Sequence, residues 1–395
     1  MTKQQIGGTM KTFTPLSSIL LILHMNILFL SKSHPPTIGG IEKQNYELAQ
    51  ALGKITPITV IANTRGKKFL PLFLPYVLFK GLSQLKNHDV ILIGDGVLAP
   101  IAFILSIFAP HKTYISIVHG LDITFAQKKS LFGRVYRLFN IPSLKTMDKL
   151  IAVGNETITR ALEAGIPKSR CVFIPNGIDE KNVVAKRSRK DLENLLGRNL
   201  EGKYVLLRVG RYVEHKGVEW FIRNVIPLMS DDVIFVSAGG VVTSQKAGDA
   251  NFFPRCKQTV EKLHLHDRVH LLTNLKWEDM KTLLNTADIV VSPNIRVSGS
   301  MEGFGINAIE AGICKKPVVA SDLDGLKDAI QDGVSGILVE PENAQAFIKA
   351  ILELLDDEEK RISLGESASS YILKNFTWEI IAKRYLEEIE KIKKG

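Results

Sequence analysis

Cysteine is scarce in this chain. Its 395 residues include only Cys171, Cys256 and Cys314. These cysteines are far apart and odd in number, and their spacing matches no metal-binding or redox motif. A disulfide framework is therefore excluded, and the composition fits a reduced, cytoplasmic compartment.

A dinucleotide-binding fingerprint is also missing. No Gly-x-Gly-x-x-Gly follows the first expected strand, Asn26–Leu30, where a Rossmann-type dehydrogenase would carry one. This absence argues against a dehydrogenase, although the rest of the chain has the α/β pattern in which that motif occurs.

An uninterrupted apolar run of transmembrane length is also missing at the beginning of the chain. His24 and Asn26 interrupt the first run, so its clean part is too short to span a bilayer, and no A-x-A-like cleavage site follows it. We expect residues 1–24 to be a leader that is disordered or a misassigned start, with Met25 as the functional start. No other segment has the composition of a transmembrane helix.

Acidic residues are scarce in the first half of the chain but not in the second half. Residues 1–197 carry 25 Lys and Arg against 12 Asp and Glu, whereas residues 198–395 carry 26 against 29. A basic half suits an anionic membrane surface, a phosphorylated acceptor or nucleic acid, and it also fits a solvated lysine-rich surface. Of the three partners, we expect an acceptor or a membrane surface and no nucleic acid.

Two stretches have the composition of a membrane contact. Lys128–Lys149 places Lys and Arg among Leu, Phe and Val side chains, and Phe69–Leu82 is rich in Phe, Leu and Pro. A basic amphipathic segment suits an anionic bilayer interface, but the same pattern fits a core helix with a solvated basic face. A peripheral contact through Lys128–Lys149 is therefore one of two open interpretations.

Short β-branched runs alternate with helical stretches along the rest of the chain. The runs are continuously apolar, which is typical of strands buried on both faces of a parallel sheet. The pattern predicts two doubly wound α/β domains in tandem. The expected strands are Asn26–Leu30, Ile58–Ala62, Val90–Ile93, Tyr114–Val118, Leu150–Val153, Val172–Ile174, Tyr204–Val209, Val233–Ser237, Val269–Leu272, Ile289–Ser292, Val318–Ala320 and Gly336–Val339.

The domain boundaries follow from this pattern. We expect an N-terminal domain over residues 25–190 and a C-terminal domain over residues 198–377, with the polar stretch Glu180–Asn199 as the linker. The apolar spacing from Val218 to Met229 predicts one helix. Residues 378–395 form a charged amphipathic helix that we expect to cross back to the N-terminal domain.

The strongest chemical signal follows the strand Ile289–Ser292. There, the segment from Glu302 to Glu310 contains Gly303 and Gly305, whose small size lets the backbone approach a ligand closely. The segment opens a helix, and a helix N-terminus is a ready diphosphate site. Glu310 lies roughly 6 Å into that helix, within reach of ribose hydroxyls, while Glu302 could reach the hydroxyls of a sugar.

Two further elements also follow expected strands. Arg211 and Lys216 flank a turn after Tyr204–Val209, at the strand end where open α/β sheets bind ligands, so both could neutralise a leaving diphosphate. His119 ends the strand Tyr114–Val118, where it could bind a sugar hydroxyl or be a satisfied core histidine. Gly39 and Gly40 in the first domain leave room for a ligand at the backbone.

The Glu-x7-Glu spacing of Glu302 and Glu310 around Gly-Phe-Gly resembles the hallmark of the family 4 retaining glycosyltransferases. Gly210-Arg211 followed by Lys216-Gly217 is similar to that family's Gly-Arg…Lys-Gly element. The resemblance covers most of residues 25–390. It implies a GT-B fold, in which two Rossmann-like domains face a central cleft.

The resemblance also implies roles for single residues. Glu310 would hold the ribose of the donor and Glu302 its sugar. His119 would act at the donor sugar or close to the reaction centre. The remaining implied contacts to the diphosphate come from Gly39, Gly40, Arg211, Lys216 and the amides of Phe304, Gly305 and Ile306.

One element departs from the family pattern. Where the family has Gly-Gly and then a glutamate, this chain has Asp324-Gly325 and then Asp328. The departure weakens any specific donor contact at this position.

The predicted function is the transfer of a hexose from a UDP- or GDP-sugar, with retention, to a hydroxyl of a glycan or lipid-linked acceptor of the cell envelope. No Asp-x-Asp metal motif is evident near the expected site, so we expect no metal requirement and no cofactor. We expect a cytoplasmic enzyme, peripheral on the inner face of the membrane if Lys128–Lys149 binds lipid. The alternatives are an epimerase or hydrolase of nucleotide-sugars with the same fold, and a catalytically silent membrane-bound scaffold. Against the scaffold stand five intact residues, namely Glu302, Glu310, Arg211, Lys216 and His119.

Overall fold

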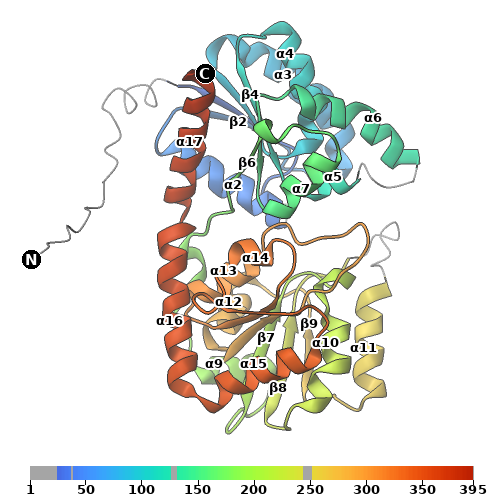
Figure 1. Cartoon of the computed structure of the whole chain (residues 1–395), viewed down its shortest axis with the longest axis vertical. Helices are drawn as coiled ribbons and strands as arrows, with labels where there is room; N and C mark the ends of the chain where they lie inside the picture. The colour runs from blue at the N-terminus through green and yellow to red at the C-terminus, as the bar shows by residue number, and fades with distance from the viewer. Residues whose placement is uncertain (1–24, 37–38, 126–130, 243–250, 395) are drawn as a thin grey trace, which may run out of the picture.

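The computed structural model describes residues 25–36, 39–125, 131–242 and 251–394. Two α/β domains lie one above the other, each built on a parallel sheet (Figure 1). The N-terminal leader predicted over residues 1–24 lies outside the described residues.

The first sheet has the order β2-β1-β3-β4-β5-β6 and is parallel throughout. Its central strands are fully buried, as their continuous apolar sequences predict. Its strands are β1 (Ile27–Ser31), β2 (Ile58–Ala62), β3 (Val90–Ile93), β4 (Thr113–Val118), β5 (Lys149–Ala152) and β6 (Cys171–Phe173), and its helices include α2 (Gly40–Gly53), α3 (Leu70–Gln84), α4 (Ala99–Phe108), α5 (Leu121–Thr124), α6 (Leu131–Thr146) and α7 (Asn155–Glu163).

The second sheet has the order β12-β11-β10-β7-β8-β9 and is also parallel. The prediction of twelve strands in two doubly wound sheets is confirmed within the described residues, but the edge strands β2, β6, β9 and β12 are partly exposed. The strands are β7 (Tyr204–Val209), β8 (Val233–Ala238), β9 (Val269–Leu272), β10 (Ile289–Ser292), β11 (Val318–Ser321) and β12 (Ile337–Val339), with helices α10 (Val218–Asn224), α11 (Phe252–Lys262), α12 (Trp277–Thr286), α13 (Ile306–Ile313), α14 (Leu326–Ala329), α15 (Ala344–Asp356) and α16 (Glu358–Asn375).

The single helix predicted from Val218 to Met229 is wrong. Helix α10 ends at Asn224, and a short 3-10 turn, η7 (Ile226–Leu228), follows it. Pro227 lies in this turn, and proline both lacks an amide hydrogen and disfavours a helical residue before it. The apolar face nevertheless stays buried, because both pieces pack into the core of the second domain.

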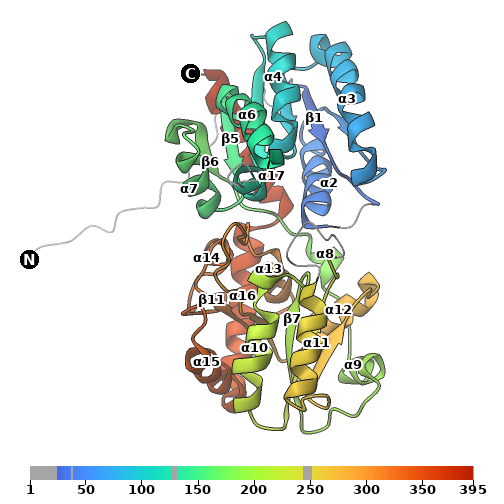
Figure 2. The ribbon, with the colours of Figure 1, turned by 90° about the vertical axis from the view of Figure 1, so that its right-hand side faces the viewer.

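Two crossings connect the domains. The first is the chain from β6 through α8 (Glu180–Val183) and α9 (Arg189–Leu196), so the expected polar linker is partly helical. The second is the passage from α16 to α17 (Trp378–Lys394), as Figures 1 and 2 show. Helix α17 packs on α2 and β4 of the first domain.

The crossings touch each other. The amide of Ile178 donates to the carbonyl of Phe376 at 2.8 Å, and a Cβ on Gly177 would lie 2.4 Å from the ring of Trp378. The Trp378 indole donates to Glu47 on α2 at 2.6 Å. These contacts fix the two crossings against one another beneath the first domain.

Candidate donor site between the domains

The amino end of α13 is the centre of the site. Gly305 precedes the helix with φ +80°, and a Cβ on it would lie 2.9 Å from a methyl carbon of Leu326, so this position needs glycine. The ring of the preceding Phe304 is buried and packs edge-on against Phe376. The side chain therefore anchors the loop in the core, while the helix presents its first amides as an anion site.

Lys216 and Glu302 meet beside this helix end. Lys216 comes from the 3-10 turn η6 (Glu214–Lys216) after β7, and its ammonium donates a short hydrogen bond to the Glu302 carboxylate. Asn294 Nδ2 donates to the same oxygen at 3.2 Å. Both charged side chains are nearly covered, with exposed fractions of 12% and 13%.

The pKa values of the pair follow from this burial. Burial alone would raise the pKa of Glu302, but the Lys216 ammonium outweighs it and lowers that pKa to about 2. Burial lowers the pKa of Lys216, and the positive charges of the nearby Arg208 and Arg211 lower it further. The negative charge of Glu302 opposes this shift. Glu302 is thus firmly ionised, and Lys216 is a buried cation beside it.

Arg208 supports the loop that carries Arg211. Its guanidinium, at the end of β7, is 1% exposed and donates to the carbonyls of Gly210 and Arg211, and burial lowers its pKa to about 10. The sequence analysis missed this role, although an arginine in an otherwise apolar strand is the signal that reveals it.

His215 lies between the same elements. It is 8% exposed, and its Nδ1 shares a hydrogen bond of 2.7 Å with the Ser300 hydroxyl. Burial, followed by the Lys216 charge, lowers the pKa of His215 to about 4. A neutral histidine therefore fixes the polar segment before Glu302 to η6.

Glu310 lies within α13 and is 8% exposed. Its carboxylate is already paired, because Lys43 Nζ on α2 of the first domain lies 2.9 Å from Oε1. The same ammonium lies 4.6 Å from the ring centre of Trp277. Sequence analysis missed Lys43, since nothing local in α2 sets it apart from a surface lysine.

His119 follows β4 in the first domain and is 7% exposed. Its Nε2 lies 2.9 Å from the carbonyl of Gly94 and therefore carries a hydrogen, while its own amide donates to Asp122 at 3.0 Å. A Cβ on Gly303 would be 3.0 Å from the His119 carbonyl. The histidine is thus partly satisfied within its own domain and also borders the Glu302 loop.

A charged pair lies next to His119. Lys32 follows β1, Asp95 follows β3, and the ammonium and carboxylate are 3.1 Å apart. Asp95 is fully buried, and this burial raises its pKa although Lys32 opposes the rise. Sequence analysis missed the pair, because its residues are 63 positions apart and meet only through the β1–β3 pairing.

The remaining predicted residues lie around the same helix end. Gly40 begins α2, and a Cβ on it would lie 3.7 Å from the Ile306 side chain, so the amino ends of α2 and α13 adjoin. Gly39 precedes Gly40, and Thr37 and Ile38 of this loop lie outside the described residues. The Arg211 side chain is exposed.

The atypical aspartates have structural partners. Asp324 accepts the Glu302 amide at 3.1 Å, and Asp328 accepts the amide and side chain of Asn155, in the first domain, at 2.7 and 2.6 Å. The prediction that no Asp-x-Asp is evident near the site is wrong as a statement about the sequence, because Asp322 and Asp324 form one beside Glu302. Asp322 lies 3.7 Å from Lys327. Within the described ranges, no three His, Cys, Asp or Glu side chains group as metal ligands.

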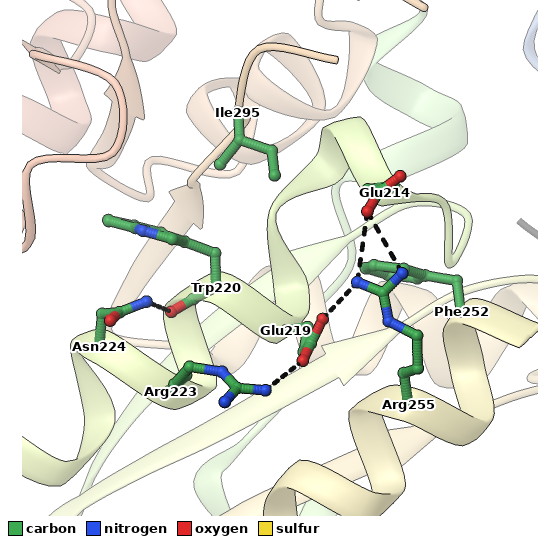
Figure 3. Close-up of a pocket in the computed structure, with 8 residues that line it drawn as sticks. All are labelled: Glu214, Glu219, Trp220, Arg223, Asn224, Phe252, Arg255 and Ile295. Atoms are coloured by element: carbon green, nitrogen blue, oxygen red, sulfur yellow. Dashed lines mark hydrogen bonds and ion pairs between the residues drawn. The ribbon is translucent and has the colours of Figure 1, made fainter. Parts of the chain in front are cut away.

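A separate pocket of about 200 Å³ lies on the second domain near η6 (Figure 3). Arg255 joins Glu214 and Glu219 at 3.2 and 2.6 Å, and Arg223 also pairs with Glu219. These charges satisfy one another, so the pocket needs no charged ligand. No described helix has the length and apolarity required to cross a bilayer.

Two family models match the chain. The model described as Glycosyltransferase Family 4 matches residues 38–182, and the model described as Glycosyl transferases group 1 matches residues 196–371. The two matches together take in both domains and every site element from Gly39 to Glu310. The chain belongs to the family 4 glycosyltransferases.

Relatives of this glycosyltransferase include an uncharacterized glycosyltransferase of Methanocaldococcus jannaschii, 28% identical over 67% of this chain and 65% of the relative. Another is the N,N'-diacetylbacillosaminyl-diphospho-undecaprenol alpha-1,3-N-acetylgalactosaminyltransferase of Campylobacter jejuni, 30% identical over 64% of this chain and 63% of the relative. The matches thus span less than two thirds of these relatives.

The fold is also that of solved glycosyltransferase structures. HepE of Anabaena, solved with UDP and glucose, superposes with a TM-score of 0.75 over 93% of this chain and 100% of that one, at 21% identity. The sucrose-phosphate synthase of Thermosynechococcus elongatus gives a TM-score of 0.74 at 20% identity, over 93% of this chain and 99% of that one. The predicted GT-B fold is confirmed.

Proposed function

We propose that this family 4 glycosyltransferase moves a hexose from a UDP- or GDP-sugar to an acceptor hydroxyl with retention of anomeric configuration. The observation that carries the proposal is the Lys216–Glu302 ion pair in the segment before α13, with Glu310 further along that helix and the His119 carbonyl beside Gly303. A diphosphate requires an anion site and a cation. The two carboxylates can accept hydrogen bonds from the hydroxyls of a sugar and of a ribose.

The roles follow from these positions. The diphosphate binds the first amides of α13, where Lys216 and Arg211 offset the charge that develops as it leaves. Glu302 accepts hydrogen bonds from the sugar, and Glu310 accepts them from the ribose. His119 Nε2 is committed to Gly94, so this histidine contacts the sugar through the other side of its ring.

The acceptor hydroxyl attacks the anomeric carbon from the face that the diphosphate leaves. The bond to the diphosphate breaks as the new glycosidic bond forms, and the hydroxyl proton passes to the departing phosphate oxygen. Orientation between the two domains and charge stabilisation supply the rate enhancement. We propose that the enzyme requires no metal, and full activity in the presence of a chelator is the test.

A lipid-linked or cell-envelope acceptor is the second part of the proposal. The Campylobacter relative is named for an acceptor joined to diphospho-undecaprenol, and such a lipid lies in a membrane. The Lys- and Arg-rich first half of this chain suits both an anionic acceptor and an anionic bilayer.

The first domain supports this with an apolar outer surface. Helix α4 packs against both α3 and α6, and all three expose large apolar side chains. The basic Lys80, Arg134 and Arg137 are exposed on the same helices, so an anionic bilayer complements the surface in both apolarity and charge. The most exposed apolar side chains are Leu72, Tyr76 and Phe79 on α3, Ile107 and Phe108 on α4, and Leu131, Leu138 and Phe139 on α6.

Flotation with phosphatidylglycerol vesicles tests this contact. We expect Leu138→Ser/Phe139→Ser and, separately, Arg134→Gln/Arg137→Gln to reduce binding while nucleotide binding is unchanged. The described part of the predicted Lys128–Lys149 contact begins at Leu131, since residues 126–130 lie outside the described residues. Unchanged flotation of both variants would reject the membrane contact.

Calorimetric titration with UDP, GDP and their sugars tests the donor site. Glu310→Ala should weaken the nucleotide that binds by about ten- to a hundredfold, because a hydrogen bond to a charged group contributes about 1.5–3 kcal/mol. Glu366→Ala is the matched control, since this glutamate is exposed on α16. If folded protein binds no nucleotide, the transferase proposal fails and the silent scaffold gains support.

An epimerase or hydrolase would pass the same binding test. Release of free sugar or an isomerised donor, at a rate that no acceptor lipid changes, would identify one of these activities. Acceptor-dependent release of the nucleoside diphosphate supports the transferase.

A further inference from the structure

The ion pair between Lys43 and Glu310 joins the two domains at the ribose position. Lys43 lies one turn into α2 of the first domain, and its Nζ is 2.9 Å from Glu310 Oε1 on α13 of the second. The same ammonium lies 4.6 Å from the ring centre of Trp277, also in the second domain. A carboxylate and an aromatic face of one domain thus hold a cation of the other.

We propose that Lys43 competes with the donor ribose for Glu310, so that donor binding releases a contact between the domains. The inference rests on the donor site proposed above and adds a residue from the opposite domain to it. Lys43 acts through Glu310 and is a positioning residue.

The competition follows from how little of Glu310 is open. Its side chain is 11% exposed, whereas that of Lys43 is 36% exposed. A ribose diol that binds Oε1 of this carboxylate therefore meets Lys43 there. The lysine is the partner that can move, because its long side chain is flexible and partly solvated.

Lys43 also keeps its charge. Burial lowers the pKa of Lys43, but the negative charges of Glu310 and Glu47 outweigh this effect, so the pKa is raised. Glu47 lies one turn further along α2 and accepts the Trp378 indole at 2.6 Å and Asn182 Nδ2 at 3.4 Å. The helix that presents Lys43 is thus fixed to both domain crossings, so the position of the ammonium depends on the arrangement of the domains.

One other contact between the domains lacks this link to the donor. Asn155 binds Asp328, and neither residue belongs to the proposed ribose or diphosphate contacts. Donor binding can therefore break the Lys43 contact while the Asn155–Asp328 contact persists. The two contacts have different consequences, which experiment can separate.

Nucleotide titration of Lys43→Met tests the competition, because methionine keeps most of the aliphatic length and removes the charge. A partly exposed ion pair contributes little, so we expect the nucleotide Kd to fall by only about two- to fivefold. Lys43→Arg should keep the wild-type value. Lys54→Met is the matched control, since it removes the same charge from the exposed end of the same helix.

Salt provides a readout that a purely structural role would not change. Raising the salt to about 1 M screens the ion pair, so the Kd values of wild type and Lys43→Met should converge. Amine-reactive labelling gives a second readout without a variant: saturating UDP or GDP should increase the labelling of Lys43 relative to Lys54.

The outcomes separate this inference from the proposed function. If wild type binds nucleotide and Lys43→Met binds it equally or more weakly, the competition is overturned while the donor site stands. Reduced labelling of Lys43 on nucleotide binding would overturn it in the same way. If neither protein binds any nucleotide, the donor site itself is absent and both proposals fail.

Discussion

Removing the charge of Glu302 should destabilise the second domain strongly. In the native structure, its carboxylate is the anionic partner of the nearly buried Lys216. In Glu302→Gln, Lys216 keeps a neutral acceptor but loses the charge that compensates it, while Arg208 and Arg211 remain close enough to repel it. Breaking one side of a buried ion pair costs about 3–5 kcal/mol.

This magnitude can be measured by urea or thermal unfolding near pH 7. For a domain of this size, 1 kcal/mol shifts the midpoint by roughly 2–4 °C, so Glu302→Gln should unfold roughly 6–20 °C below wild type. The double variant Lys216→Met/Glu302→Gln removes both charges and should recover most of the loss. Glu214→Gln is the control, because its pair with Arg255 is about half exposed and is worth about 0–1 kcal/mol.

The reasoning is refuted if Glu302→Gln unfolds within about 0.5 kcal/mol of wild type, which is the range of a neutral surface substitution. It is also refuted if the double variant is no more stable than the single one, since Lys216 would then not be the source of the cost. Either result would mean that water solvates the charges of Lys216 and Glu302 in solution.

Three further predictions concern single residues. The pKa of buried His215 is about 4, whereas that of an unfolded histidine is about 6.5. Between these pH values the unfolded state binds a proton that the folded state does not bind. The free energy of unfolding should therefore fall by on the order of 3 kcal/mol as the pH drops from about 6.5 to about 4. His215→Asn should flatten this slope in urea titrations at several pH values. Gly217→Ala should lower the unfolding midpoint strongly, because φ is +66° and the added Cβ would lie 1.7 Å from the Pro293 carbonyl oxygen; an unchanged midpoint contradicts this. Asp328→Asn should weaken the contact between the domains, detected as faster proteolysis at the crossings without a change in nucleotide affinity, and unaltered cleavage would argue against it.

The sequence by itself determined the sheets and the motif residues. Most of the strands are apolar runs, and burial on both faces of a parallel sheet demands that pattern of the central strands. Glu302, Glu310 and Lys216 were identifiable because each follows a strand, at the edge where parallel strands bind ligands. The break at Pro227 is also predictable from the sequence, because proline lacks an amide hydrogen and disfavours a helical residue before it, whereas apolar spacing alone does not indicate the break.

The tertiary structure alone decided which charges meet. Lys216 and Glu302 are 86 positions apart, Asn155 and Asp328 are 173 apart, and Lys43 and Glu310 are 267 apart. Hydrophobic periodicity is a local signal that reports burial and not the partner of a polar group. Such partners depend on how the two domains pack. In the sequence Lys43 is an ordinary helical lysine, and it becomes the ion-pair partner of Glu310 only when α2 lies beside α13.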